Sequence, residues 1–123
     1  MAIQKNIIDR FQTITSGDMS QATVTSAYSD VRYLDNIGIQ IQWTSANAVG
    51  VFTIECSDNY NPITNTTGTW VALTFSPALT APASNNGEFL VNVNQCPHAW
   101  IRVVYTRTSG TGTLNAWVHA KEI

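Results

Sequence analysis

The sequence predicts an all-β protein, an antiparallel β-sandwich or jelly roll of about seven to eight strands. Apolar and polar residues alternate with a period of two in several runs, most regularly over 37–44 and 99–122. Clusters of Gly, Pro, Asn, Asp and Ser separate these runs, as is typical of turns between short strands. No segment makes a convincing helix, and neither an internal repeat nor a second domain is evident.

The first 28 residues are expected to form an N-terminal arm (1–28) that includes a first weak strand at 21–28, ahead of a sandwich body at 29–123. The spacing of the apolar residues in the arm is compatible with a helix, but their β-branched character favours an extended chain at least as well. An apolar arm has to be covered, so we expect it to pair with its own sheet or to lie on a neighbouring subunit. The arm residues assigned to this contact are Ile3, Ile7, Ile8 and Phe11.

Four strands are expected in the body before its C-terminal segment, at 37–44, 51–56, 70–75 and 88–94. A polar connection at 57–68 is longer than most hairpin loops. Successive side chains of a strand point to opposite faces, so the alternation also predicts which side chains enter the core. From these four strands they are Ile37, Ile39, Ile41, Trp43, Phe52, Ile54, Cys56, Val71, Leu73, Phe75, Phe89, Val91 and Val93.

Residues 99–122 are predicted to form a β-hairpin, because two alternating runs flank the turn-like sequence Ser109-Gly-Thr-Gly112. Two turn positions are possible, and they shift the pairing by two residues without changing the inward face. The inward side chains are Ile101, Val103, Tyr105, Leu114, Ala116, Val118 and Ala120.

The outward face of this hairpin is too apolar to meet only water. It consists of Trp100, Arg102, Val104, Trp117 and His119. Trp70 likewise faces away from its local core set. We expect the arm or another subunit to cover these side chains, because aromatic residues contribute strongly to interfaces. A sugar-stacking platform built from Trp70, Trp100 or Trp117 is an alternative, and simple exposure stays open. One hairpin register places Arg102 against Trp117 as a cation–π pair.

Composition limits the partners. The chain has 123 residues, the size of one domain, and a net charge of −2 without a basic patch, which argues against nucleic acid. No apolar run approaches the ~18 residues of a membrane span, which argues against a membrane partner. The N-terminus lacks the apolar core of a signal peptide, so we expect a soluble, non-secreted protein.

Residues of the types that commonly act in catalysis are scattered along the chain, so the sequence predicts no enzyme, no metal site and no cofactor. His98 and His119 lie in no recognisable triad segment. A calcium site formed by the loop carboxylates of Asp30, Asp35 and Asp58 is a weaker alternative to their capping of turns. The two cysteines, Cys56 and Cys96, are too few for a zinc site. A disulfide between them is disfavoured without an export signal, but the pairing stays open.

Several short motifs between residues 29 and 121 carry a resemblance to a known class of proteins. They are Ser29-Asp30, Leu34-Asp35-Asn36, Ile39-Gln-Ile-Gln-Trp43-Thr44, Gly50-x-Phe52-x-Ile54-x-x-Ser57, Trp70-x-x-Leu73, Ile101-Arg-Val-x-Tyr105 and Ser109-Gly-x-Gly-x-Leu-Asn-Ala116. With these motifs the chain resembles small phage-encoded β-sandwich proteins of the virion. The resemblance implies a capsid decoration or cement protein, or an accessory of the tail or fibre, and it implies no catalytic residues.

We therefore predict a bacteriophage structural protein that stabilises the head by binding across subunits of the major capsid protein. It is expected to be a homo-oligomer, with a trimer favoured because closed symmetry suits a threefold site. Its place would be the capsid surface of the virion, which is assembled in the host cytoplasm. The alternative is a carbohydrate- or receptor-binding β-sandwich module of a phage tail or fibre.

Overall fold

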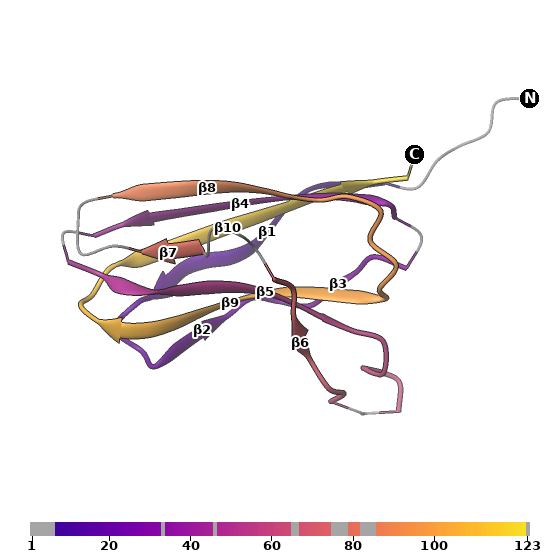
Figure 1. The fold of residues 1–123 in the computed structure, drawn as a ribbon, viewed down its shortest axis with the longest axis horizontal. Helices are drawn as coiled ribbons and strands as arrows, with labels where there is room; N and C mark the ends of the chain where they lie inside the picture. Colours follow the sequence, from indigo (N-terminus) through magenta and orange to yellow (C-terminus); the bar gives the residue numbers. More distant parts are fainter. Residues whose placement is uncertain are drawn as a thin grey trace, which may run out of the picture.

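The structure is a computed structural model that describes residues 7–32, 34–45, 47–64, 67–74, 79–81 and 86–122. Two antiparallel sheets pack face to face as a sandwich (Figure 1). One sheet has four strands in the order β1-β10-β4-β8. The other has six, in the order β2-β9-β5-β6, with β3 also paired to β9 and β7 to β5. The strand bounds are β1 Ile7–Asp18, β2 Thr23–Thr25, β3 Ser29–Asp30, β4 Asn36–Thr44, β5 Val49–Ser57, β6 Val71–Ala72, β7 Leu79–Ala81, β8 Gly87–Val93, β9 Trp100–Ser109 and β10 Thr113–Lys121.

The predicted all-β antiparallel sandwich is confirmed. The described part of the chain has ten strands rather than seven or eight, because β2, β3, β6 and β7 are pairings of only two or three residues. The strand expected at 70–75 is one of these short pairings, and Phe75 lies outside the described residues. Its predicted inward face is wrong at Val71, which is 65% exposed, whereas Leu73 is partly buried against the core. No described segment is a helix that could span a membrane.

The core lies between the two sheets and contains most of the side chains that alternation predicted to face inward. From the four-stranded sheet, Ile37, Ile39, Ile41 and Trp43 of β4 are buried. From the six-stranded sheet, the matching side chains of β5 and β9 are buried against them. Phe89 and Val93 of β8 are only partly buried, because β8 is the last strand of its sheet.

The predicted hairpin at 99–122 is wrong, although its inward side chains are right. β9 and β10 belong to different sheets, so Tyr105 lies opposite Phe52 and Leu114 lies opposite Trp43. The connection at 110–112 crosses from one sheet to the other (Figure 1). The inward face of each strand is unchanged, because both sheets direct that face to the same core.

Contacts with the β4–β5 connection explain this crossing. Gly110 has a φ of +81°, and a Cβ placed there would lie 2.1 Å from the carbonyl oxygen of Asn47. The Thr111 amide donates to Asn47 Oδ1 at 3.1 Å, and the Ser45 hydroxyl donates to the Thr111 carbonyl. The two connections, both of which pass between sheets, are therefore held together at one end of the sandwich.

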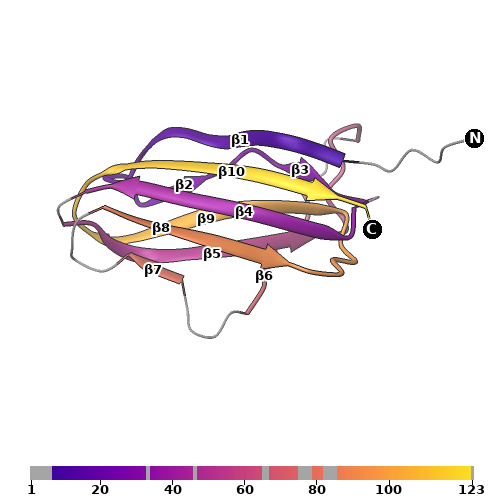
Figure 2. The same cartoon turned by 90° about the horizontal axis from the view of Figure 1, so that it is seen from above.

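The N-terminal segment pairs with its own sheet, which was one of the two alternatives for it. β1 runs antiparallel to β10 along the edge of the four-stranded sheet (Figure 2). Ile14 is buried and lies opposite Ala116. Ile3 lies outside the described residues, and for Ile8 only the backbone register, opposite Ala120, is described.

Candidate functional site

The outward residues of the C-terminal segment do not share one face, contrary to expectation. Because β9 and β10 lie in different sheets, Trp100, Arg102 and Val104 are on the outer side of the six-stranded sheet. Trp117 and His119 are on the outer side of the four-stranded sheet, at the opposite surface of the sandwich. The two groups therefore have to be considered as separate sites.

Arg102 is held on the outer side of the six-stranded sheet by an acid and by aromatic rings. Its Nε and Nη2 donate to Glu55 Oε1 at 2.7 and 2.6 Å, across the β5–β9 register. Its guanidinium carbon lies 4.3 Å from the centre of the Trp70 ring and 5.7 Å from that of Tyr28. The expected pairing of Arg102 with Trp117 is therefore wrong, and Trp70 takes that place.

The chain itself covers Trp70 and Trp100. The Tyr60 ring, from the long connection after β5, lies 4.8 Å from the Trp100 ring and 5.7 Å from the Trp70 ring, measured between centres. Tyr28 lies 4.9 Å from Trp70. Val104 is buried on the same side. These rings pack on one another, and Tyr28 is the last residue of the predicted N-terminal arm, so the arm contributes to this contact and no second subunit is needed for it. Trp70 and Trp100 nevertheless stay partly exposed.

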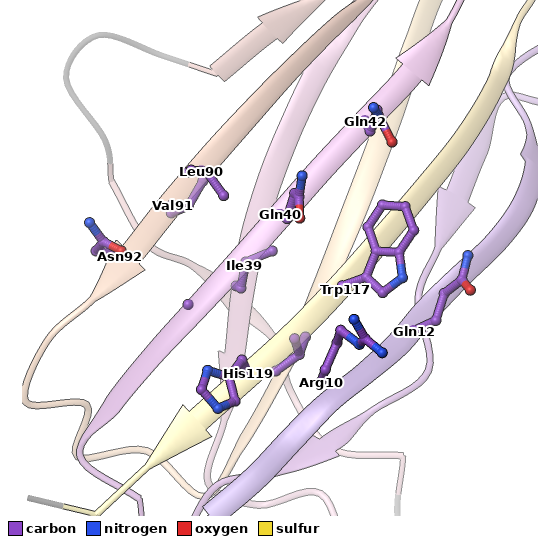
Figure 3. A pocket seen from close by; sticks show the side chains of 12 residues that line it. Arg10, Gln12, Ile39, Gln40, Gln42, Leu90, Val91, Asn92, Trp117 and His119 are labelled. Atoms are coloured by element: carbon purple, nitrogen blue, oxygen red, sulfur yellow. The ribbon is translucent and has the colours of Figure 1, made fainter.

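Trp117, in contrast, stands in an open groove of about 980 Å³ on the outer side of the four-stranded sheet (Figure 3). The strand register places one residue from each of the four strands in a row across the sheet. Gln12 lies opposite Trp117, Trp117 opposite Gln40, and Gln40 opposite Leu90. Further lining side chains stand on either side of this row. They include Arg10, Gln42, Asn92 and His119.

Several polar side chains of the groove are free to meet a ligand. Those of Gln40, Gln42, Asn92 and His119 make no hydrogen bond to another described residue. Gln12 is fixed at one end, because its Nε2 donates to Asn115 Oδ1 at 3.1 Å and to the Ile14 carbonyl at 3.2 Å. Alternation in β4 and β10 predicted these side chains to face outward, but it did not predict that their two strands are neighbours.

A second cluster, which sequence reasoning did not assemble, joins the end of β5 to the segment before β9. His98 Nδ1 lies 3.1 Å from Asp58 Oδ2, and the Ala99 amide donates to Asp58 Oδ1 at 2.8 Å. Both hydrogen bonds lower the pKa of Asp58, and the bond with His98 has the larger effect. The two residues are forty positions apart in the chain, and no motif marks either of them.

The thiols of Cys56 and Cys96 meet beside this pair, and both are buried and free. A hydrogen bond between the two sulfurs lowers the pKa of Cys96 to about 6. The same hydrogen bond and, after it, burial raise the pKa of the Cys56 thiol. The contact of His98 with Cys96 is made by its backbone N–H, and its ring Nδ1 is engaged with Asp58. The arrangement is a pair of contacting thiols rather than a nucleophile held by a histidine base.

The carboxylates considered for calcium do not converge. Asp30 is bonded to Arg32, with Nη2 and Oδ2 2.6 Å apart, and Asp58 to His98. Among the described residues, no three His, Cys, Asp or Glu side chains gather closely enough to hold a metal ion. The calcium alternative is therefore wrong for these side chains.

Comparison with known proteins gives no family. No family model matches the chain, and no curated protein does. Among solved structures, the fold is similar to part of dimeric latent PorU from Porphyromonas gingivalis, with a TM-score of 0.44 and 10% sequence identity. The match covers 98% of this chain and 13% of that one, so the chain spans a small part of its length.

Proposed function

We propose that this chain is a structural protein of a bacteriophage virion, a decoration or cement protein of the capsid. The motifs between residues 29 and 121 support the virion assignment through their resemblance to small phage β-sandwich proteins. The architecture suits such a role, because a rigid sandwich with few charged residues offers extended surfaces for contact. The function needs no reaction, no cofactor and no nucleic acid.

The observation that carries the proposal is the exposed apolar edge at β1. This strand ends the four-stranded sheet and has β10 as its neighbour. Its other side is bonded to Ala27 at Thr13, and the part that contains Ile7 and Phe11 is an edge of the sheet. The side chains of Ile7 and Phe11 are 64% and 46% exposed there. A strand edge with large exposed apolar side chains is a template for association, and proteins that stay alone usually protect it.

The partner is then the major capsid protein, contacted across neighbouring subunits. An interface of ordinary size, about 800 Å² on each partner, would resist separation of those subunits. We favour a homotrimer, because three copies placed around a threefold position repeat one contact with each capsid subunit. The protein would sit on the capsid surface of virions that assemble in the host cytoplasm.

Co-sedimentation with empty capsids that lack the protein tests this function. We expect the double variant Ile7→Ser/Phe11→Ser to lose binding while its thermal unfolding stays close to that of the wild type. Val71→Ser is the matched control, because Val71 is 65% exposed on β6, in the other sheet. Failure of the wild type to bind capsids, or unchanged occupancy by the double variant, would overturn the proposal.

A further inference from the structure

The geometry points to a carbohydrate-binding site in the groove of the four-stranded sheet, with Trp117 as the surface on which a sugar ring stacks. The ligand class is an oligosaccharide of hexose units. This inference goes beyond capsid binding and does not depend on it, because the groove lies on the face of the sheet whereas the proposed capsid contact lies at the β1 edge.

Trp117 supplies the apolar part of such a site. Its indole lies at the centre of the sheet, between Gln12 of β1 and Gln40 of β4 (Figure 3). A hexose has a face of C–H groups that packs on an aromatic ring, while its hydroxyls point outward from the rim. An aromatic side chain provides a large contact area at a low cost in conformational entropy, which suits a ligand that is only weakly hydrophobic.

The amides around the indole supply the polar part. Gln40, Gln42 and Asn92 each carry a donor and an acceptor, and none of these side chains bonds to another described residue. A sugar hydroxyl is likewise both donor and acceptor, so neutral amides match it better than fixed charges do. Among the described side chains no carboxylate lines the groove, and Arg10 adds one cation, so an acidic sugar is also accommodated.

The size of the groove and the position of its lining residues on paired strands favour an oligosaccharide. Its volume of about 980 Å³ is at the upper end of the ~300–1,000 Å³ usual for small-molecule sites. The lining side chains stand on four paired strands rather than on loops, so little ordering is required when a ligand binds. A groove of this volume suits a chain of sugars better than one monosaccharide.

A protein partner is the competing occupant, and the lining argues against it. The fully buried centre of a protein interface is usually more apolar than the rest of the surface and is depleted of charged residues. Here Leu90, which is 78% exposed, is the large aliphatic side chain that accompanies Trp117, and amides make up much of the remainder. Trp70 and Trp100 are less suited to stacking a sugar, because their rings already pack on Tyr60 and Tyr28, although Trp100 lines a smaller pocket of about 440 Å³.

Binding of the purified full chain to an array of neutral and acidic oligosaccharides tests the site, without capsids present. We expect binding to at least one oligosaccharide, a loss of at least about tenfold in affinity for Trp117→Ala, and partial retention for Trp117→Phe. Gln40→Ala should also weaken binding. Val71→Ala, which changes the other sheet, should not.

A second measurement covers ligands that bind too weakly for an array. Titration with concentrated disaccharides, followed by the NMR signal of the Trp117 indole N–H, should move that signal and leave the indole signal of buried Trp43 in place. Absence of any oligosaccharide effect in both experiments, or full binding by Trp117→Ala, would overturn the assignment. Loss of capsid binding by Trp117→Ala, with no sugar bound, would instead assign the groove to a protein partner.

Discussion

Two isoleucines on the same strand provide a sharp test of how β1 is used. Ile14 is 5% exposed and packs in the core, whereas Ile7 is largely exposed at the other end of β1. Ile14→Ala removes three carbons from the core, at about 0.8 kcal/mol each, and leaves a cavity, so we expect a loss of about 2–4 kcal/mol. The same substitution at Ile7 should change the free energy of unfolding by less than about 0.5 kcal/mol.

The loss at Ile14 would be a large share of the total. A domain of 123 residues has a free energy of unfolding of roughly 6–18 kcal/mol, so Ile14→Ala should move the midpoint of urea unfolding well outside experimental error. The measurement is urea denaturation followed by circular dichroism for both variants. Equal and small effects at the two positions would refute the reasoning, because they would mean that β1 is not packed on the sandwich in solution.

Three further predictions concern the core and the cluster beside it. A Cβ at Gly87 would lie 2.2 Å from the Trp43 ring, so Gly87→Ala should cost about 1–3 kcal/mol. Trp43→Phe removes the nearest ring atoms, so the double variant should lose less than the sum of the single variants in urea unfolding, and additive losses would exclude this clash. Because hydrogen bonds lower the pKa of Asp58, its charge stabilises the fold above the ordinary value of 3.8, and the difference in Tm between wild type and Asp58→Asn should shrink as the pH falls below that value. A difference in Tm that does not change with pH would count against a stabilising charge on Asp58. The ultraviolet absorbance of the Cys96 thiolate should titrate near its pKa of about 6, and Cys56→Ala should move the midpoint upward by removing the thiol donor; an unmoved midpoint would disprove the sulfur–sulfur contact.

In the long strands the sequence was sufficient to predict which side chains face the core, whereas the face predicted for 70–75 was wrong at Val71. In β4, β5, β9 and β10 the alternation of apolar and polar residues is regular, and period two fixes the inward face whatever the partner strand is. The prediction of a sandwich followed from the same regularity. The short strands were missed because a pairing of two or three residues, as in β3, leaves no periodic signal.

Strand pairing was not predictable by the same reasoning. A short Gly-containing connection between two alternating runs fits a hairpin and a crossing between sheets equally well, because both keep the inward side chains inward. A non-local contact determines that the connection crosses between the sheets. Gly110 packs against the backbone of Asn47, a residue more than sixty positions earlier that belongs to the other crossing connection.

The candidate site shows the consequence of that missing information. Trp70, Trp100 and Trp117 all had the sequence signature of an outward aromatic residue, and nothing local distinguishes them. All three are partly buried, and what separates them is the kind of side chain beside each ring. Tyr60, from a connection that reads only as polar and irregular, packs on two of the three, whereas the strand register leaves Trp117 among unbonded amides. An outward aromatic residue therefore indicates a binding surface only once the rest of the chain has been shown not to cover it.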